Sequence, residues 1–541
     1  MRLRRSVVLL LVLSLVAAAC DDFDDDFDDE GFSEEAFDED DFDDDFDDDF
    51  DDDFDDDFDD ASDDDDARLA GGSDGQVAEL GAFGFSWVDC PMDVEVEIDV
   101  DCGVLTVPES RTGLSDDTIE LAVAVLRTPA ADPQDDPVVF LQGGPGGVSL
   151  AEHWSWQAED WPDHPLLAQR DLILVDQRGT GYSVPTLACD DEREEPEDCH
   201  DRLVGEGIPI AAYSTPENAA DLATLRLGLE LDEWNLFGAS YGTRLGLVLL
   251  RDHPEGVRSV VLDGVYPPNA VPAYESYVVN ALGAIDAIAA ACAAQPACTE
   301  AYGDVEVLLA EALATVADDP GSPIDHIDLF DLMFEAMYDM DRVVDIPYAL
   351  LAAIEGDVDA AIDVLEGEGG GIRPLTRSVA ARSLDPGADS SGAFHAIECR
   401  EEHPFTDLDR VEAAVDELAA AGVDALLLEA LFSGVVQGPE FICPAWDTGV
   451  ADVREQQPAV SDVPTLLLSG VFDPITPASL AQLAARDLTN ATVAVAANLS
   501  HSTVLEDDCI DGVVAAFLDD PGIAPDVSCV AGLTAPGMTL P

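Results

Sequence analysis

The stretch from Trp234 to Gly246 constrains the fold more than any other part of this sequence, because a serine there stands between two glycines at the end of an apolar run. The residues just before Ser240 are strand-like, and those after Gly242 carry apolar side chains at helical spacing. Small neighbours allow the backbone to bend sharply and to lift the Ser240 hydroxyl clear of the turn. Chance alone produces such a pentapeptide in many chains, so the prediction of a nucleophile rests on this setting of strand, turn and helix.

Buried strands and helical stretches alternate over much of the chain, which predicts an α/β protein with a mostly parallel, doubly wound sheet. An antiparallel hairpin is expected over 87–107, where apolar and polar residues alternate. From 269 to 459 the pattern is helical with no clear run of buried strands, so we expect an inserted helical lid between core segments 81–268 and 460–541. The expected buried strands are 137–141, 171–176, 235–237, 258–262, 464–470 and 492–497, and the main expected helices are 218–231, 279–294 and 408–431.

The charge balance is strongly acidic, with 117 aspartates and glutamates against 22 arginines, no lysine and a formal net charge of −95 at pH 7. Such a chain has no basic face for phosphate groups, which argues against nucleic-acid binding. Because salt screens the repulsion between like charges, we expect high ionic strength to stabilise the folded protein.

The amino-terminal region predicts export and a tether. Residues 1–20 have a basic start, a short apolar run and small residues before a cysteine, a pattern typical of an export signal rather than a membrane span. Residues 17–20 resemble a bacterial lipobox, with Ala17 where leucine is usual, so we expect a lipid anchor at Cys20 that attaches the protein to a membrane; plain secretion is the alternative. Residues 21–80 are rich in aspartate and too charged to collapse, which predicts a disordered tether. Whether calcium or a basic wall polymer binds it is left open.

Ten cysteines besides Cys20 support export, since an even set in an exported protein is most simply a set of disulfides. They fall into five pairs of neighbours along the chain. Zinc binding is the competing interpretation, but the sequence lacks the short Cys-x-x-Cys spacing that zinc sites use. The ten are Cys90, Cys102, Cys189, Cys199, Cys292, Cys298, Cys399, Cys443, Cys509 and Cys529.

A base and an acid for Ser240 are expected after later strands. Serine needs a base within hydrogen-bond reach, itself oriented by a carboxylate. Asp473 follows one predicted strand and His501 the next, so both are expected at the carboxyl edge of the sheet together with Ser240. Asp263 also follows a strand and is the rival acid. The remaining histidines, mostly expected to be solvated, are His153, His164, His200, His253, His326, His395 and His403.

A glycine-rich run at 142–147 follows the buried strand 137–141. Glycines there expose backbone N–H groups, which is what an oxyanion hole requires. We expect the N–H of Tyr241, together with that of Gly143 or Gly144, to hold a developing negative charge. An ordinary glycine-rich turn is the alternative.

Five ordered motifs together resemble the prolyl and tripeptidyl aminopeptidase family of α/β-hydrolases. They are QGGPGG at 142–147, DQRGTGYS at 176–183, GASYGT at 238–243, DPITP at 473–477 and the histidine at 501. The resemblance covers about 83–529 and implies an α/β-hydrolase fold and a serine exopeptidase that acts on free amino termini of peptides. Gln142 stands where the prolyl branch usually has histidine. This departure, the export signal and the cysteines are more similar to the secreted tripeptidyl branch.

The resemblance also implies that lid carboxylates hold the substrate ammonium group. Residues 399–402 are similar to the lid segment that supplies one of them, which makes Glu401 the candidate anchor; surface charge is the alternative in so acidic a chain. We expect no cofactor and no metal ion. Two other functions stay open: a carboxylesterase with the same three residues, and an inert, anchored acidic binding protein. The sequence leaves the oligomeric state open.

Overall fold

The computed structural model describes residues 80–92, 98–150, 165–190, 193–367, 389–437, 442–446, 448–501, 503–504 and 506–541. The predicted export signal with Cys20, residues 21–79 of the predicted tether, and His153 and His164 lie outside these residues.

Within the described residues, nine strands form one sheet in the order β1-β2-β3-β5-β4-β6-β7-β8-β9. Strands β1, β2, β3 and β5 pair antiparallel, whereas β5, β4, β6, β7, β8 and β9 run parallel. The mostly parallel sheet is therefore confirmed. The strands are β1 (Gly84–Val88), β2 (Val100–Pro108), β3 (Thr118–Leu126), β4 (Val138–Leu141), β5 (Leu172–Val175), β6 (Trp234–Ala239), β7 (Val257–Asp263), β8 (Thr465–Gly470) and β9 (Ala491–Ala496).

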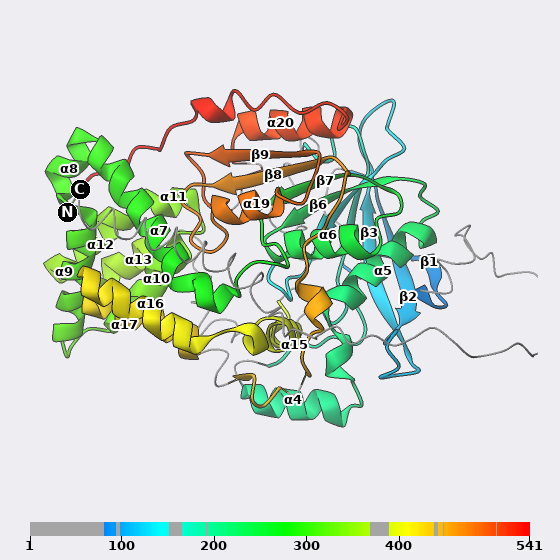
Figure 1. Ribbon diagram of the computed structural model, residues 1–541, viewed down its shortest axis with the longest axis horizontal. Coiled ribbons are helices and arrows are strands. Elements are labelled where there is room, and N and C mark those ends of the chain that lie inside the picture. The colour runs from blue at the N-terminus through cyan, green and yellow to red at the C-terminus, as the bar shows by residue number, and fades with distance from the viewer. Residues whose placement is uncertain are drawn as a thin grey trace, which may run out of the picture. The chain divides into compact units, whose positions relative to one another are not determined.

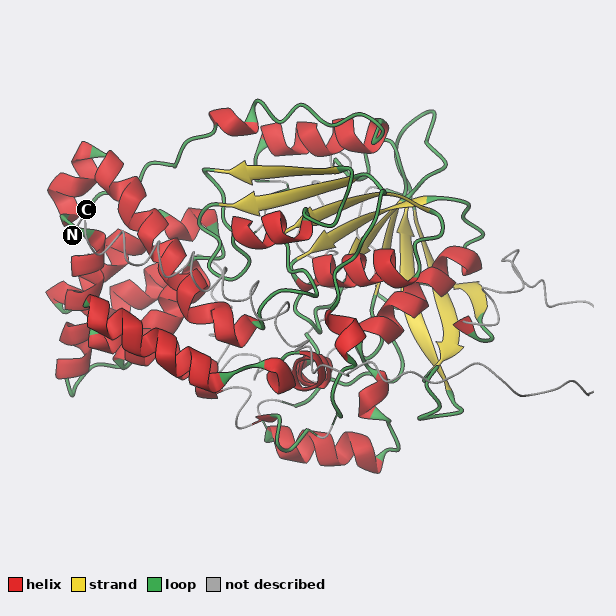
Figure 2. Cartoon of the chain, in the orientation of Figure 1, coloured by secondary structure: helices red, strands yellow, loops and turns green. Residues whose placement is uncertain are grey.

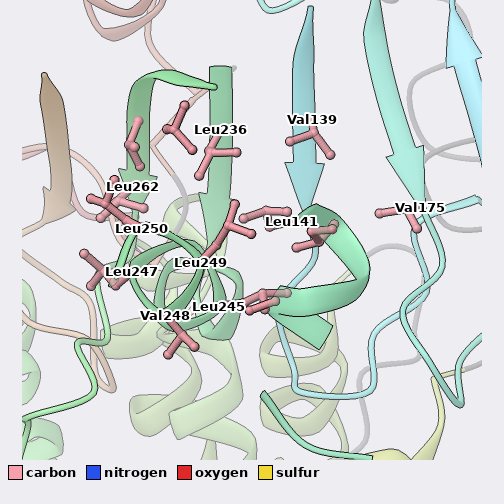
Figure 3. Close-up of a cluster of buried hydrophobic side chains, with 14 of the residues drawn as sticks. Val139, Leu141, Val175, Leu236, Leu245, Leu247, Val248, Leu249, Leu250 and Leu262 are labelled. Atoms are coloured by element: carbon pink, nitrogen blue, oxygen red, sulfur yellow. The ribbon is translucent and has the colours of Figure 1, made fainter. Parts of the chain in front are cut away.

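The central strands are apolar because helices cover both faces of the sheet. All four residues of β4 and of β5 are buried, as expected for parallel strands between two layers of helices. One face is covered by α5 (Thr215–Gly228), α6 (Tyr241–Asp252) and α19 (Ala478–Ala484). Figure 3 shows Leu245 and Leu249 of α6 in this cluster, with Leu141 of β4 and Leu236 of β6. The other face packs against α20 (Asp508–Asp519).

The segment 269–459, predicted as the lid, contains helices and turns but no strand among its described residues. The helices of this segment are α7 (Ala273–Ala294), α8 (Pro296–Tyr302), α9 (Val305–Asp318), α10 (His326–Ala336), α11 (Met340–Val343), α12 (Ile346–Glu355), α13 (Val358–Glu366), α15 (Ser391–Glu401), α16 (Leu408–Ala421) and α17 (Ala425–Gln437). Most of them gather beyond the carboxyl ends of β8 and β9, at the left of Figure 1 and Figure 2, whereas α15 lies in the lower middle of Figure 1. Outside this layer, α4 (Pro196–Gly205) follows β5, and short 3-10 turns lie at Ile210–Ala212, His403–Phe405, Val453–Gln456 and Val530–Gly532.

All three predicted helices have different bounds, and the one expected over 279–294 begins six residues earlier, at Ala273. The single helix expected over 408–431 is two helices, because Gly422 adopts a left-handed conformation (φ 88°) that ends α16. The helix expected from 218 begins three residues earlier, at Thr215, and Pro216 lies in its first turn, where a missing N–H costs no hydrogen bond.

Helix α7 is long and apolar enough to span a membrane, but half of its apolar stretch is buried within the protein. Helices at the core of soluble domains share this composition, so the pattern is weak evidence for a membrane span.

All five predicted cysteine pairs are bonded in the structure. Three of them join cysteines 6 to 12 residues apart. Cys399–Cys443 links α15 to a later part of the lid segment, and Cys509–Cys529 links α20 to the carboxyl-terminal tail. The bonds are Cys90–Cys102, Cys189–Cys199, Cys292–Cys298, Cys399–Cys443 and Cys509–Cys529.

Candidate active site

Ser240 occupies a strained turn between β6 and α6. Its backbone has φ 53° and ψ −123°, a region that non-glycine residues rarely adopt. The turn is tight on both sides, since a Cβ on Gly238 would lie 2.5 Å from the Gly242 carbonyl oxygen, and one on Gly242 would lie 1.8 Å from that of Leu141. Both glycines are therefore required by space, and the turn has the geometry predicted for a raised nucleophile.

His501 and Asp473 lie together at the carboxyl edge of the sheet. His501 Nδ1 is 2.9 Å from Asp473 Oδ2, and Asp473 also accepts hydrogen bonds from the backbone N–H groups of Ile475 (2.9 Å) and Thr476 (2.7 Å) and from the Thr476 hydroxyl (2.6 Å). Burial by itself raises the pKa of Asp473, but the His501 charge and these hydrogen bonds lower it overall. Burial likewise opposes the charged form of His501, but Asp473 raises the pKa of the imidazole above its ordinary value.

Asp263, the rival acid, has a different role. Its carboxylate accepts hydrogen bonds from the N–H (2.9 Å) and hydroxyl (2.9 Å) of Thr503 and from the N–H of Val504 (3.0 Å). Asp263 thus binds the backbone that follows His501. Burial raises its pKa, and these hydrogen bonds lower it only in part.

The turn after β7 lies between Ser240 and His501. The Ser240 N–H donates to the Asp263 carbonyl oxygen (2.9 Å), and a Cβ on the next residue, Gly264, would lie 3.3 Å from His501 Cε1. The serine and the imidazole therefore flank the same two residues. Gly143 lies on the other side of the serine, where a Cβ would be 3.6 Å from Ser240 Oγ.

The predicted oxyanion donors are not equivalent. The Gly143 N–H donates to the side-chain oxygen of its neighbour Gln142 (3.2 Å). No hydrogen-bond acceptor for the N–H of Gly144 or Tyr241 is found among the described residues. Gly144 and Tyr241 are therefore the better pair of donors for an oxyanion, because their N–H groups need not first release another partner.

Glu401 lies in a buried network rather than alone on the surface, being only 2% exposed. Its two oxygens accept from the N–H (2.8 Å) and the hydroxyl (2.7 Å) of Thr215, at the start of α5. The Thr215 hydroxyl also lies 2.8 Å from the hydroxyl of Tyr241, and Arg244 approaches Glu401 at 3.7 Å. Surface charge is therefore the wrong alternative for Glu401, and its oxygens already hold two parts of the fold together.

Two further carboxyls on this turn of chain face the same arginine. Arg244 Nη1 is 2.9 Å from Glu402 Oε1, and Glu402 Oε2 accepts from the Ala273 N–H (3.0 Å) at the start of α7. Burial, with the nearby charge of Glu402, raises the pKa of Glu398 to about 8. We call the three carboxyl groups at the end of α15, Glu398, Glu401 and Glu402, together with Arg244 of α6, the α15 carboxyl cluster.

The sequence did not point to two residues beside His501. The Thr476 hydroxyl lies 3.1 Å from His501 Nδ1 and bonds Asp473, so it braces the pair; its place in the DPITP motif was the available signal. Tyr338, between α10 and α11 of the lid, sets its ring edge-on to the imidazole with centroids 4.8 Å apart. Next to it, Met337 accepts a hydrogen bond from the Ser500 hydroxyl. The lid therefore contacts the His501 loop at two adjacent points.

Several other histidines are less exposed than predicted. The side chains of His200 and His326 are 14% exposed, and His395 is 7% exposed against the Trp446 ring. Burial lowers the pKa of His395 to about 4, so this imidazole is neutral at physiological pH. The prediction that these groups are solvated is wrong for these three, since His200 and His395 pack against the Trp446 ring and His326 lies 3.5 Å from Glu429.

The sheet, the strained serine turn and the buried histidine–carboxylate pair define a serine hydrolase of the α/β-hydrolase fold. Residues 136–309 match the family described as alpha/beta hydrolase fold, and residues 430–529 match the family described as TAP-like protein. The chain belongs to the α/β-hydrolase peptidase family.

Named relatives agree with this placement. The serine protease Hip1 of Mycobacterium tuberculosis is 27% identical over 453 residues, which cover 77% of this chain and 84% of that protein. The tripeptidyl aminopeptidase of Streptomyces coelicolor is 28% identical over 230 residues, 37% of this chain and 42% of that protein. The proline iminopeptidase of Arabidopsis thaliana is 31% identical over 134 residues, 25% of this chain and 28% of that protein.

Proposed function

We propose that the protein is an exported serine exopeptidase that removes short pieces from the free amino termini of peptides, with Ser240 as nucleophile, His501 as base and Asp473 as the orienting acid. The observation that carries the proposal is the 2.9 Å contact between His501 Nδ1 and Asp473 Oδ2, beside a serine with φ 53°. With Nδ1 facing the carboxylate, Nε2 is the nitrogen left to take the serine proton.

In the proposed reaction, the Ser240 hydroxyl oxygen attacks the carbonyl carbon of the scissile peptide bond, and its proton passes to His501 Nε2. The N–H groups of Gly144 and Tyr241 stabilise the oxyanion of the tetrahedral intermediate. His501 then protonates the leaving amine, which yields an acyl-enzyme. Water, activated by the same imidazole, releases the acyl group and restores the serine. The raised pKa of His501 and the lowered pKa of Asp473 support this pairing of charges.

For the free amine of the substrate we propose recognition by the α15 carboxyl cluster. Glu401 is the candidate from the sequence, but its oxygens already accept from Thr215. Glu398, with a pKa of about 8, is largely protonated at neutral pH, and a nearby ammonium group would favour its ionised form. We therefore place Glu398 beside Glu401 as a second candidate.

Covalent labelling tests the nucleophile. We expect a fluorophosphonate to label the protein, and Ser240→Ala to abolish labelling while the protein remains folded. Labelling that persists at the same rate in Ser240→Ala would contradict the assignment. The inert binding protein would show no labelling at all.

Comparison of a peptide with its amino-acetylated twin separates an aminopeptidase from a carboxylesterase. An aminopeptidase cleaves only the free-amine peptide, whereas an esterase prefers simple esters and is indifferent to acetylation. Glu401→Gln and Glu398→Gln should each raise KM for the free-amine peptide and leave a simple ester unaffected if the residue holds the ammonium group. Equal effects on peptide and ester would remove that residue as an anchor.

Five disulfides and the similarity to Hip1 suggest an exported or cell-surface protein, because disulfides persist in oxidising compartments. We propose further that a lipid on Cys20 anchors the chain to a membrane. Metabolic labelling with a lipid precursor, lost on Cys20→Ser, tests the anchor; release of unlabelled protein into the medium would indicate plain secretion.

A further inference from the structure

The motif at 176–183 has no part in the reaction proposed above, although its first residues lie at the carboxyl end of β5, next to the glycine-rich loop after β4. Asp176 is completely buried. Its Oδ1 accepts from the backbone N–H groups of Ser149 (2.8 Å) and Leu150 (2.9 Å), and its Oδ2 accepts from that of Tyr182 (2.8 Å). One carboxylate therefore binds the far end of the loop that begins at Gln142.

Gln177 binds the near end of the same loop. Its side-chain Nε2 donates to the carbonyl oxygen of Gln142 (3.0 Å), one residue before Gly143. Between these two ends, the Gly147 N–H donates to the Gly143 carbonyl oxygen (3.3 Å) and the Gln142 side chain donates to the Val148 carbonyl oxygen (3.3 Å), both within the loop. From the lid segment, the Ser390 N–H donates to the Gly146 carbonyl oxygen (2.9 Å). Two consecutive side chains thus hold both ends of a loop that carries Gly144.

The rest of the motif keeps Asp176 in place. The Ser183 hydroxyl donates to the Asp176 carbonyl oxygen (2.7 Å) and accepts from the Ala122 N–H (3.1 Å) on β3. Gly181 must lack a side chain, because a Cβ there would lie 2.1 Å from Asp176 Oδ2. The motif therefore holds the Asp176 carboxylate in a fixed position at the edge of the sheet.

We propose that Asp176 and Gln177 are positioning residues for the oxyanion hole: they fix the two ends of the Gln142–Leu150 loop and so hold the Gly144 N–H where the oxyanion forms. This inference rests on the proposed function. A hydrogen-bond donor stabilises a transition state only if it is already in place when charge develops, and displacement by about 1 Å costs on the order of 100-fold in rate.

The test compares two altered residues with a matched control. Asp176→Asn keeps the size of the side chain but replaces one acceptor oxygen with an NH2 group, which only donates. That NH2 group must face either the Tyr182 N–H or the N–H groups of Ser149 and Leu150, so hydrogen bonds on one side are lost. Gln177→Met keeps the length and removes the donor to Gln142. The control, Asp221→Asn, makes the same chemical change at another buried carboxylate (2% exposed), which pairs with Arg178 (2.8 Å) and has no hydrogen bond to the loop among the described residues.

Kinetics are measured at pH 8 on a peptide p-nitroanilide with a free amino terminus, together with inhibition by the matching peptide trifluoromethyl ketone and by the peptide acid product. Burial raises the pKa of Asp176 to about 6, so its carboxylate is ionised at pH 8. We expect Asp176→Asn and Gln177→Met to lower kcat by roughly 10- to 100-fold with little change in KM. The Ki of the ketone, which forms an oxyanion with Ser240, should rise in parallel, whereas the Ki of the product should not.

If Asp176 and Gln177 had a purely structural role, their variants would unfold at a lower temperature and contain a smaller active fraction. The ratio of the ketone Ki to the product Ki would then be the same as in Asp221→Asn. An unchanged ratio and kcat in Gln177→Met, or a change in KM alone, would overturn the inference, and Gln177→Met decides if Asp176→Asn does not fold. Failure of the proposed function itself is distinguishable in the parent protein: an inert protein would not react with a fluorophosphonate, and a carboxylesterase would react but would not cleave the free-amine peptide p-nitroanilide.

Discussion

Replacement of Gly242 by alanine tests the geometry of the serine turn most directly. A Cβ at this position would lie 1.8 Å from the Leu141 carbonyl oxygen and 2.6 Å from the Leu141 carbonyl carbon, whereas real contacts begin at 3.0 Å. The start of α6 and the end of β4 must therefore separate by about 1.2 Å. Both obstacles are backbone atoms, so no side-chain rotation relieves the contact.

That displacement moves Ser240 relative to the loop that carries Gly144. Because a misplacement of about 1 Å costs on the order of 100-fold in rate, we expect kcat/KM and the rate of fluorophosphonate labelling to fall by about that factor. Overpacking should also lower the free energy of unfolding by about 1–3 kcal/mol. Labelling is the sharper measurement, since a small fluorophosphonate needs the serine and its oxyanion donors but no peptide site.

Gly246→Ala is the matched control on the same helix. A Cβ at Gly246 would meet only side-chain ends, Leu141 Cδ1 at 3.3 Å and Leu262 Cδ2 at 3.4 Å, which can yield slightly. We expect near-normal labelling and, from the better helix propensity of alanine, little change in stability. If Gly242→Ala labels as fast as Gly246→Ala, the close approach of helix and strand does not position the nucleophile, and the argument is refuted.

Four further results are expected. Asp473→Asn should lower kcat by about 10³- to 10⁴-fold through loss of the correct imidazole tautomer. Asp263→Asn loosens the chain after His501 and removes a charge that also favours the protonated imidazole, but it leaves the hydrogen bond to Nδ1 intact and should cost clearly less; similar losses would contradict this division of roles. The acidic limb of kcat/KM should have its midpoint above 6.5, because Asp473 raises the pKa of His501, and a midpoint below 6.5 in the parent protein would contradict the pairing. The free energy of unfolding should fall as the pH rises through the folded-state pKa of His501, because the stabilisation from its raised pKa is complete only below pH 6.5. It should also fall in acid, as the pH drops through the lowered pKa of Asp473. Both effects are measured as the free energy of unfolding against pH. Finally, with a net charge of −95, the protein should unfold at higher temperature as KCl rises to molar concentrations, and a melting temperature independent of salt would remove the hypothesis of salt adaptation.

Local patterns made much of the fold predictable. The apolar run before Ser240 and the glycines around it predict the strand, turn and helix, because backbone freedom and periodicity are properties of neighbouring residues. Cysteine pairing followed from the same logic, since four of the five bonds join residues no more than 20 positions apart. Parallel strands then bring the residues that follow them to one edge, which predicted that Asp473 and His501 meet.

Side-chain partners across long sequence separations were not predictable in this way. The choice between Asp473 and Asp263 depends on which carboxylate reaches the imidazole, and Asp263 instead bonds Thr503, 240 residues away. Two further contacts likewise depend on how the lid packs against the core. Thr215 donates hydrogen bonds to Glu401, 186 residues away, and the Tyr338 ring packs on His501.

The sequence by itself determined the class of fold, the strand–turn–helix at Ser240, the cysteine pairs and the edge of the sheet where Asp473 and His501 meet, because each of these follows from spacing along the chain. Only the tertiary structure decided which acid pairs with His501, which N–H groups are free to meet an oxyanion, and that Asp176 and Gln177 hold the loop between them. Those outcomes depend on differences of a few ångströms between distant segments, and hydrogen bonds and steric contacts change completely over such distances.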